Sequence, residues 1–302
     1  MADAEAATYD ITEDLIRAVL TDQHPDLAEL DIQQPVRGWD NELWRLGTDL
    51  AVRVPRTERA PGLLLREHRW VPALAPRLPL PVTTPVRLGE PSARLPVPWT
   101  VTTWLPGTPA DHSPATRGDH AADTLAEFLR ALHAEAPAEA PRIAERGAPF
   151  DTLAHHFDGR HEEAAAYSDV DPAALRAVWE DAVTAPPWQG PPVWLHGDLH
   201  PANVVVTDGT LSGVLDFGEL CAGDPATDLA AAWLLLPEGS APRFFEAYAR
   251  ADEAAIRRAR GRAVLQCLAL IDIGRNGERG LPGGKVTWGR AGRATLRRLT
   301  GR

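Results

Sequence analysis

The sequence of 302 residues predicts an α+β protein of two lobes. Short β-like runs are concentrated before residue 107, which predicts a small antiparallel-sheet N-terminal lobe with one packed helix. Amphipathic and Ala-rich helical segments dominate after that point, and a single β-hairpin signal interrupts them, so the C-terminal lobe is expected to be mainly helical. We place the N-terminal lobe at 1–102, a hinge at 103–107 and the C-terminal lobe at 108–302.

The first elements of the chain are a helix and a set of strands. Apolar side chains recur at near-helical spacing over residues 11–20, which predicts a helix. Three β-like runs follow, at 32–37, 41–47 and 50–55. The last two are joined by a tight turn around Gly47, which indicates a hairpin.

The rest of the N-terminal lobe continues this pattern. Residues 63–75 form a helical pattern that we expect to bend or end near Pro72, because an internal proline removes a backbone hydrogen bond. Two further strands are predicted at 85–91 and 99–107. The order of three strands, a helix and two strands describes a small sheet carrying one packed helix.

The C-terminal lobe opens with an amphipathic helix over residues 119–135. Five apolar side chains share one of its faces, namely Ala122, Leu125, Phe128, Leu129 and Leu132. From there to the C-terminus the sequence favours helix, interrupted only by the hairpin.

Composition and charge exclude several classes of protein. The N-terminus is acidic and has no signal-peptide pattern, and the longest apolar run, Leu229–Leu236, is too short to cross a membrane. The two cysteines, Cys221 and Cys267, have no metal-ligand spacing. We therefore expect a cytoplasmic protein with no membrane partner, as a monomer or a dimer.

The distribution of charge bears on the partner. A net charge of −11 argues against a nucleic-acid partner. The chain from Arg250 onward is basic and the remainder strongly acidic, which would suit a cationic small molecule. Only Lys285 is a lysine among the 31 basic residues, so roles that usually fall to lysine are expected to fall to arginine.

A hairpin brings three polar side chains toward one another. The runs 204–206 and 212–217 flank an Asp-Gly turn, which is a strong hairpin signal. A turn centred on that dipeptide brings Asn203 close to Val214, and Asp216 then lies near the strand end where the HGDLHP segment begins. We therefore expect Asp198, Asn203 and Asp216 to converge at one end of the hairpin.

These three side chains suit a particular metal. Two carboxylates and a carboxamide are the hard-oxygen ligands of Mg²⁺, which also binds substrate phosphates. A transition-metal hydrolase site would need more His or Cys ligands than this neighbourhood supplies. The spacing H-x-D-L-x-x-x-N followed by D-F-G is the pattern of a kinase catalytic loop and its metal-binding aspartate.

The segment HGDLHPANVVV…GVLDFGELCAGDPATDLA resembles the signature of the aminoglycoside phosphotransferase family. The resemblance joins three motifs in the correct order and extends over most of the N-terminal lobe. It implies a bilobal protein-kinase-like fold. It further implies that Asp198 orients or deprotonates the acceptor hydroxyl, and that Asn203 and Asp216 hold Mg²⁺.

The resemblance also implies supporting roles. His196 matches the family's structural loop histidine, and His200 is interpreted as loop scaffold. Asp224 suits a helix N-cap, with Pro225 at the first helical position and Asp228 near the helix N-terminus. By resemblance, Asp224 is the aspartate that braces the catalytic loop.

The nucleotide side departs from the family pattern. Arg53 stands on the third strand where the family has lysine, and Glu67 on the following helix is its expected partner. The RGWDN segment has one glycine, so it is a poor phosphate-binding loop. By alignment, the carbonyl of Thr103 and the N–H of Leu105 would bind the adenine base.

These observations predict a Mg²⁺-dependent kinase that transfers the γ-phosphate of ATP or GTP to a hydroxyl of a small molecule, with an aminoglycoside or related antibiotic as the first candidate. A macrolide or another metabolite is an alternative acceptor, and a non-catalytic nucleotide-binding pseudokinase is an alternative class, supported by Arg53 and the poor glycine loop. A protein kinase is disfavoured because no room remains for an activation loop. Acidic side chains at 158, 162 and 163 are candidates for a cationic acceptor, although a solvated helix face is the favoured explanation for them.

Overall fold

The computed structural model describes residues 9–147 and 150–301 and divides the chain into two units. The first unit comprises the described residues up to Pro76, together with Pro81–Pro106 and Asp216–Gly218. The second comprises the described residues of Arg77–Leu80 and Gly107–Leu215 and those from Glu219 onward. Arg77–Leu80 therefore belongs to the second unit although its neighbours in sequence belong to the first, and Asp216–Gly218 belongs to the first although its neighbours belong to the second. The hinge over 103–107 stays a prediction.

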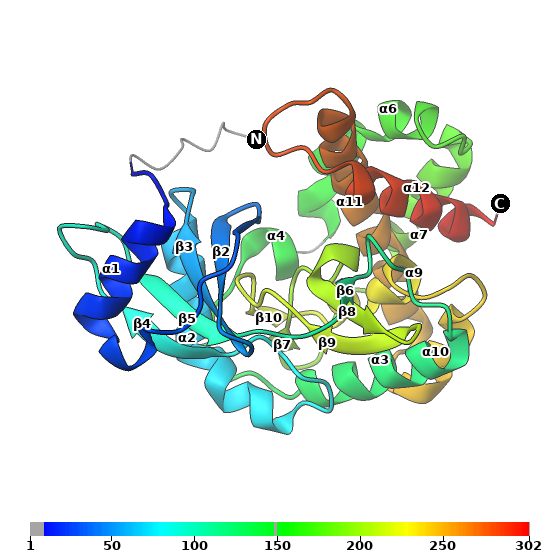
Figure 1. The fold of residues 1–302 in the computed structure, drawn as a ribbon. Helices are drawn as coiled ribbons and strands as arrows, with labels where there is room; N and C mark the ends of the chain where they lie inside the picture. Colours follow the sequence, from blue (N-terminus) through cyan, green and yellow to red (C-terminus); the bar gives the residue numbers. More distant parts are fainter. Residues whose placement is uncertain (1–8, 148–149, 302) are drawn as a thin grey trace. The chain divides into compact units, whose positions relative to one another are not determined.

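The first unit is built on a five-stranded antiparallel sheet (Figure 1). In spatial order its strands are β1 (Val36–Arg37), β2 (Asn41–Leu46), β3 (Leu50–Pro55), β5 (Trp99–Thr103) and β4 (Pro85–Gly89). The predicted hairpin between β2 and β3 is confirmed, with Leu46 paired to Leu50 and Gly47 in the left-handed region at a φ of +60°. Glycine suits that turn because it has no Cβ to clash there.

Helices cover both faces of this sheet. Successive residues of a strand point to opposite faces, so Val52 and Val54 join a core cluster with α1 (Glu13–Gln23), while Arg53 faces α2 (Ala60–Leu74). The helix α2 ends at Leu74, two residues after Pro72, which agrees with the prediction of an end near this proline. The proline removes one backbone donor, and the buried apolar face of the helix keeps the last turn in place.

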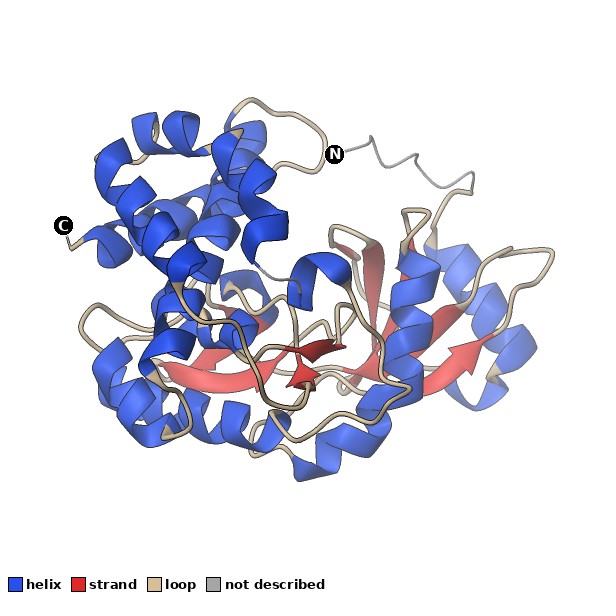
Figure 2. Cartoon of the chain, turned by 180° about the vertical axis from the view of Figure 1, so that it is seen from behind, coloured by secondary structure: helices blue, strands red, loops and turns tan. Residues whose placement is uncertain are grey.

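The second unit is mainly helical (Figure 2). Its helices are α3 (Gly118–Leu132), α4 (Ala144–Gly147), α5 (Ala154–Asp158), α6 (His161–Ala166), α7 (Pro172–Thr184), α8 (Ala226–Leu229), α9 (Ala231–Leu234), α10 (Ala241–Tyr248), α11 (Glu253–Glu278) and α12 (Val286–Thr300). Short 3₁₀ turns occur in both units. Those at Pro25–Leu27 and Ala75–Arg77 lie in or at the edge of the first unit, and those at Phe150–Leu153 and Pro201–Asn203 lie in the second. No helix among the described residues is both long enough and apolar enough to span a membrane.

The second unit contains more β-structure than the sequence predicted. The expected hairpin is present as β8 (Val204–Thr207) and β9 (Thr210–Val214), and β6 (Thr108–Pro109) joins its edge. A separate antiparallel pair is formed by β7 (Val193–Leu195) and β10 (Cys221–Gly223). The prediction of a single hairpin among helices was therefore wrong. Strands of two or three residues are too short to show an alternating pattern.

The two C-terminal helices cross at very short range. A Cβ added to Gly274 of α11 would lie 2.2 Å from the Cα of Gly289 in α12, so only two glycines allow this approach. Trp288 is the neighbour of Gly289 in the chain, and its ring meets the ring of His200 edge to face, with centroids 4.6 Å apart. The crossing therefore brings an aromatic side chain to the loop after β7.

Candidate active site

The loop after β7 has a fixed shape because of one glycine. Gly197 has a φ of +82°, a conformation that residues with a Cβ rarely adopt. A Cβ at this position would lie 2.5 Å from the carbonyl oxygen of Glu219. The chain can therefore turn tightly here only with glycine, and it directs the next residue, Asp198, away from the strand.

A buried carboxylate holds this loop. The Oδ2 of Asp228 accepts a hydrogen bond from the His196 amide at 2.7 Å, and its Oδ1 accepts one from the Gly197 amide at 2.9 Å. The side chain of Asp228 is fully buried and also lies 3.4 Å from Nε2 of His133. Asp228 is thus the aspartate that braces the loop, a role that the sequence resemblance had assigned to Asp224.

Asp224 has a different set of contacts. Its Oδ2 accepts a hydrogen bond from Nε of Arg258 at 2.7 Å, and its Oδ1 accepts one from the Ala226 amide at 3.0 Å. The carboxylate therefore satisfies the start of α8 and ties it to α11. The turn at Pro225 points Asp224 toward α11, so that Asp228, four residues later, faces the loop.

Asp198 lies among donors on both of its oxygens. Its Oδ1 is 3.2 Å from Nη2 of Arg146 and accepts from Nε2 of Gln266 at 3.4 Å. Its Oδ2 accepts from Nδ2 of Asn203 at 3.5 Å and lies 3.6 Å from Nε2 of His200. Burial alone would raise the pKa of this carboxyl, but the Arg146 guanidinium and His200 outweigh it and hold the pKa well below its usual range. The group is therefore ionised at neutral pH.

Both loop histidines contact the backbone. Nδ1 of His196 accepts a hydrogen bond from the Asp198 amide at 3.2 Å, so its Nε2 is assigned as the donor to the Leu215 carbonyl oxygen at 2.9 Å. Nδ1 of His200 accepts from the Ala202 amide at 3.3 Å. Both rings thus stabilise the loop in which Asp198 lies.

Asn203 lies close to Val214, as predicted, although the hairpin register contains a one-residue shift. Val204, and not Asn203, lies opposite Val214. The ladder shifts between Val205 and Val206 because Ser212 is an extra residue in β9, and this bulge moves every later pair by one position. Asn203 remains close to the strand end, since its carbonyl oxygen accepts from the Leu215 amide at 2.8 Å.

Asp216, the residue after Leu215, contacts residues of the first unit. Its Oδ1 lies 3.4 Å from Nη2 of Arg53, and its amide donates to the hydroxyl of Thr83 at 3.3 Å. The Oδ1 also accepts from the Gly218 amide at 3.3 Å. Its φ of +57° is unusual for a residue with a Cβ, and such backbone strain of about 1–3 kcal/mol is concentrated at functional sites.

Arg53 and Glu67 form a buried ion pair across β3 and α2. An Nη1 donor of Arg53 is hydrogen-bonded to Oε2 of Glu67, and both side chains are buried. Burial raises the pKa of Glu67 to about 8, and the nearby charge of Asp216 adds to this rise, whereas the Arg53 guanidinium, which also lies near Asp216, opposes it. Among the described residues, Nε of Arg53 and Oε1 of Glu67 have no hydrogen-bond partner. Such buried, unsatisfied polar atoms suit a site that accepts a ligand.

The residues predicted to contact adenine lie at and after the end of β5. The amide of Thr103 donates to the Thr84 carbonyl at 3.0 Å, and the Thr103 hydroxyl accepts from the Thr84 amide at 2.9 Å. Leu105 follows the strand and is half-buried. The single glycine of RGWDN, Gly38, closes its turn by donating to the Asn41 carbonyl at 2.9 Å. The adenine contacts stay predictions.

The oxygen donors proposed for Mg²⁺ fit that ion chemically. Nδ2 of Asn203 donates to the main-chain oxygen of Asp198 at 2.9 Å. This hydrogen bond orients the carboxamide, whose other atom, the acceptor oxygen Oδ1, is the proposed metal ligand. The carboxylate of Asp216 is 47% exposed. Amide and carboxylate oxygens are the ligands that Mg²⁺ takes together with nucleotide phosphates. The described residues contain no cluster of three or more His, Cys, Asp or Glu side chains that would hold a metal.

The acidic candidates for a cationic acceptor already have basic neighbours. Glu163 pairs with Arg275 at 2.5 Å, and its side chain is 55% exposed. The carboxylate at 158 lies 3.7 Å from Arg176, and the one at 162 lies 3.9 Å from His161. Two of these carboxylates, at 158 and 163, form solvated ion pairs with arginines, and the one at 162 is exposed, which lends little support to an acidic acceptor pocket at this place.

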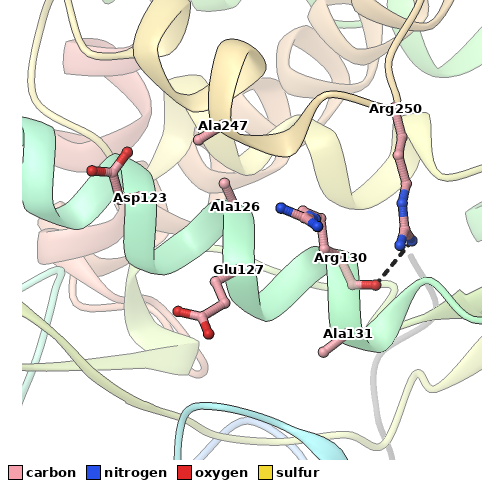
Figure 3. Close-up of a pocket in the computed structure, with 7 residues that line it drawn as sticks. All are labelled: Asp123, Ala126, Glu127, Arg130, Ala131, Ala247 and Arg250. Atoms are coloured by element: carbon pink, nitrogen blue, oxygen red, sulfur yellow. Dashed lines mark hydrogen bonds between the residues drawn. The ribbon is translucent and has the colours of Figure 1, made fainter.

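A surface hollow of about 500 Å³ lies elsewhere in the second unit (Figure 3). Side chains of α3 line it together with Ala247 and Arg250, whose guanidinium donates to the Arg130 carbonyl at 3.0 Å. None of the predicted site residues lines this hollow. It therefore does not locate a substrate site for Asp198.

Comparison with solved structures identifies the fold. The fold is similar to that of a wild-type aminoglycoside 2'-phosphotransferase-IIIa in its GDP complex, with a TM-score of 0.67 over 96% of this chain and 99% of that chain, at 19% identity. It is also similar to the apoenzyme of a macrolide 2'-phosphotransferase from Brachybacterium faecium, with a TM-score of 0.58 over 92% and 97% of the two chains, at 22% identity. The predicted kinase-like fold is confirmed.

The chain belongs to the phosphotransferase enzyme family, whose model matches residues 31–263. Among curated proteins it is similar to an aminoglycoside 3'-phosphotransferase of Escherichia coli and to one of Salmonella typhimurium, in each case 28% identical over 158 residues. Each match covers 50% of this chain and 58% of the relative, so it spans little more than half of the relative's length. The family resemblance predicted from the HGDLHPAN and DFG motifs is confirmed.

Proposed function

We propose that this protein is a kinase that transfers the γ-phosphoryl group of ATP or GTP to a hydroxyl group of a small molecule. The observation that carries the proposal is the placement of Asp198. Its carboxylate is ionised and follows a loop whose backbone is held by both oxygens of Asp228. The family to which the chain belongs supports the same chemistry.

The transfer needs positioning more than a strong base. The acceptor oxygen forms a bond to the γ-phosphorus while the bond to the β–γ bridging oxygen breaks, and the nucleoside diphosphate leaves with that electron pair. The hydroxyl proton passes to the Asp198 carboxylate and from there to water. Because the pKa of Asp198 is held well below its usual range, this group orients the hydroxyl and accepts its proton late.

The nucleotide side of the proposal rests on six residues. Arg53, held by Glu67, would contact the nucleotide phosphates in place of the usual lysine. Asn203 and Asp216 would hold Mg²⁺, which neutralises phosphate charge when it is bound. The backbone of Thr103 and Leu105 would bind the base.

The acceptor is proposed by class. An aminoglycoside is the first candidate, because the curated relatives are aminoglycoside 3'-phosphotransferases. A macrolide is the second candidate, because a macrolide 2'-phosphotransferase shares the fold. Another metabolite remains an alternative acceptor. The alternative of a non-catalytic pseudokinase rests on Arg53, and it predicts nucleotide binding without turnover.

The test is nucleotide turnover by the wild type and by Asp198→Asn. Nucleoside diphosphate release is measured with MgATP and MgGTP, first alone and then with kanamycin, a macrolide or small alcohols. Removing the carboxylate is expected to lower kcat by about 10²–10⁴-fold. The control is Asp208→Asn, in the exposed turn of the β8–β9 hairpin, which should leave turnover unchanged. Equal turnover by the wild type and Asp198→Asn would rule out this function, and binding without turnover would favour the pseudokinase.

A further inference from the structure

An arginine that no motif points to lies against Asp198. Nη2 of Arg146, in α4, is 3.2 Å from Oδ1 of Asp198 and 3.9 Å from Oε1 of Glu219. The Arg146 side chain is 30% exposed, so it borders solvent beside the carboxylate. The guanidinium is therefore placed to contact a molecule that binds at Asp198.

The backbone of α4 is anchored at several points. The hydroxyl of Thr227 donates to the Arg146 carbonyl oxygen, and Nη1 of Arg262 donates to the Glu145 carbonyl oxygen at 3.1 Å. Ile143 packs against the buried cluster formed by β7 and β10. These contacts hold the backbone at Glu145 and Arg146, and the ion pair with Asp198 places the guanidinium beside that carboxylate.

The chemistry of the proposed reaction brings a phosphoryl group within reach of this guanidinium. A hydroxyl bound to Asp198 lies about 2.7 Å from a carboxylate oxygen. The phosphorus that the hydroxyl oxygen attacks lies about 3–3.5 Å from that oxygen. A guanidinium carries five N–H donors in a plane, so Arg146 can contact Asp198 and a phosphoryl oxygen at the same time.

We propose that Arg146 is a further catalytic residue, and this proposal rests on the proposed function. Arg146 donates a hydrogen bond to a non-bridging oxygen of the phosphoryl group while that group passes to the hydroxyl held by Asp198. The bond between the acceptor oxygen and phosphorus forms as the bond to the leaving nucleoside diphosphate breaks, and the proton of the acceptor hydroxyl goes to Asp198. Arg146 transfers no atom. It stabilises negative charge on the group in transfer, as arginine does in other phosphoryl transfers.

The competing role for Arg146 is a structural brace for the loop. A brace would lower thermal stability when it is removed, and it would alter binding and turnover together. A catalytic guanidinium would lower kcat, leave the nucleotide KM unchanged, and be replaceable by a guanidinium ion from solution. These readouts separate the two roles.

The experiment compares Arg146→Ala, Arg146→Lys and the wild type. Phosphate release from MgATP and MgGTP is followed with water as the acceptor. Release of the nucleoside diphosphate is followed with kanamycin or a macrolide added. Arg146→Ala is expected to lower kcat by about 10²–10³-fold with the nucleotide KM within about threefold, and millimolar guanidinium should restore at least about tenfold. Arg146→Lys should retain part of the activity, because a lysine keeps the charge without the planar fork. The exposed Arg142 of the same segment supplies the control Arg142→Ala, which should behave as the wild type.

The outcomes distinguish this inference from the function on which it rests. If the wild type and Asp198→Asn are equally inactive, the proposed kinase function fails and the role of Arg146 fails with it. If Asp198→Asn abolishes turnover but Arg146→Ala keeps the wild-type kcat, only the role of Arg146 is overturned. Loss of activity in Arg146→Ala without rescue by guanidinium, while Arg146→Lys is fully active and equally stable, also overturns the phosphoryl contact. Should Arg146→Ala fail to fold, the kcat of Arg146→Lys decides: a wild-type value contradicts the proposal and a reduced kcat at unchanged KM supports it.

Discussion

The carboxylate of Asp228 accepts a hydrogen bond from the His196 amide with one oxygen and from the Gly197 amide with the other. His196 and Gly197 belong to the HGD motif, whereas Asp228 belongs to the GDPATDLA motif that follows DFG. The backbone of the HGD segment is therefore shaped by a residue from a different motif. A buried carboxylate bonded in this way makes two charge-assisted hydrogen bonds, which are stronger than neutral ones.

Asp228→Asn is expected to destabilise the protein. The amide keeps one acceptor oxygen but turns an NH₂ donor toward a backbone N–H, so one hydrogen bond is replaced by two opposed donors. The free energy of unfolding should fall by about 2–4 kcal/mol, measured by urea denaturation. Glu162→Gln, whose side chain is 84% exposed, should leave the midpoint unchanged. A midpoint for Asp228→Asn equal to that of Glu162→Gln would contradict the role of this carboxylate.

Gly197→Ala and Gly239→Ala form a matched pair. Both glycines have a left-handed backbone, with φ of +82° and +83°, so each substitution costs about 1–2 kcal/mol of backbone energy. Only at Gly197 would the new Cβ meet a backbone atom, the Glu219 carbonyl oxygen at 2.5 Å, since nothing lies within 4 Å of Gly239. Gly197→Ala should therefore lose at least about 1 kcal/mol more in denaturation, and turnover should fall by about 10²-fold as Asp198 is displaced. Gly239→Ala should keep wild-type turnover, and equal effects of the two substitutions would show that the contact with Glu219 is relieved at no cost.

The buried carboxyl of Glu67 predicts a dependence of stability on pH. Its pKa in the folded state, about 8, lies above its ordinary value of 4.5, so between these pH values the folded state holds a proton that the unfolded state has released. The contribution to stability is therefore fully present below pH 4.5 and is lost as the pH rises to about 8. Relative to Glu67→Gln, which cannot ionise, the wild type should lose up to about 1 kcal/mol for each pH unit in this window.

Urea denaturation of the wild type and Glu67→Gln between pH 5 and pH 8.5 checks this expectation. Glu162→Gln serves as the control and should run parallel to the wild type. Parallel curves for the wild type and Glu67→Gln would mean that Arg53 keeps Glu67 ionised throughout, and that burial does not raise its pKa.

The sequence by itself determined the element types and the motif chemistry. Periodicity near 3.6 predicted the helices at 11–20 and 119–135, and the Asp-Gly turn predicted the β8–β9 hairpin, because these signals depend on neighbours in the chain. The spacing within HGDLHPAN identified Asp198 and Asn203 as a local group for the same reason. The β3 arginine and the α2 glutamate were recognisable only through the family resemblance, which implies a basic residue on that strand and a glutamate on the following helix.

Only the tertiary structure decided which distant residues complete the site. The choice of Asp228 over Asp224 as the brace depends on how the turn at Pro225 directs each carboxylate, and the extra residue in β9 shifts the hairpin register by one pair. The pairing of β7 with β10 and the placement of Arg146 beside Asp198 leave no pattern in the sequence. Periodicity and spacing report on neighbours along the chain, whereas contacts between distant segments are set by packing and by hydrogen bonds that form only when the whole unit has folded.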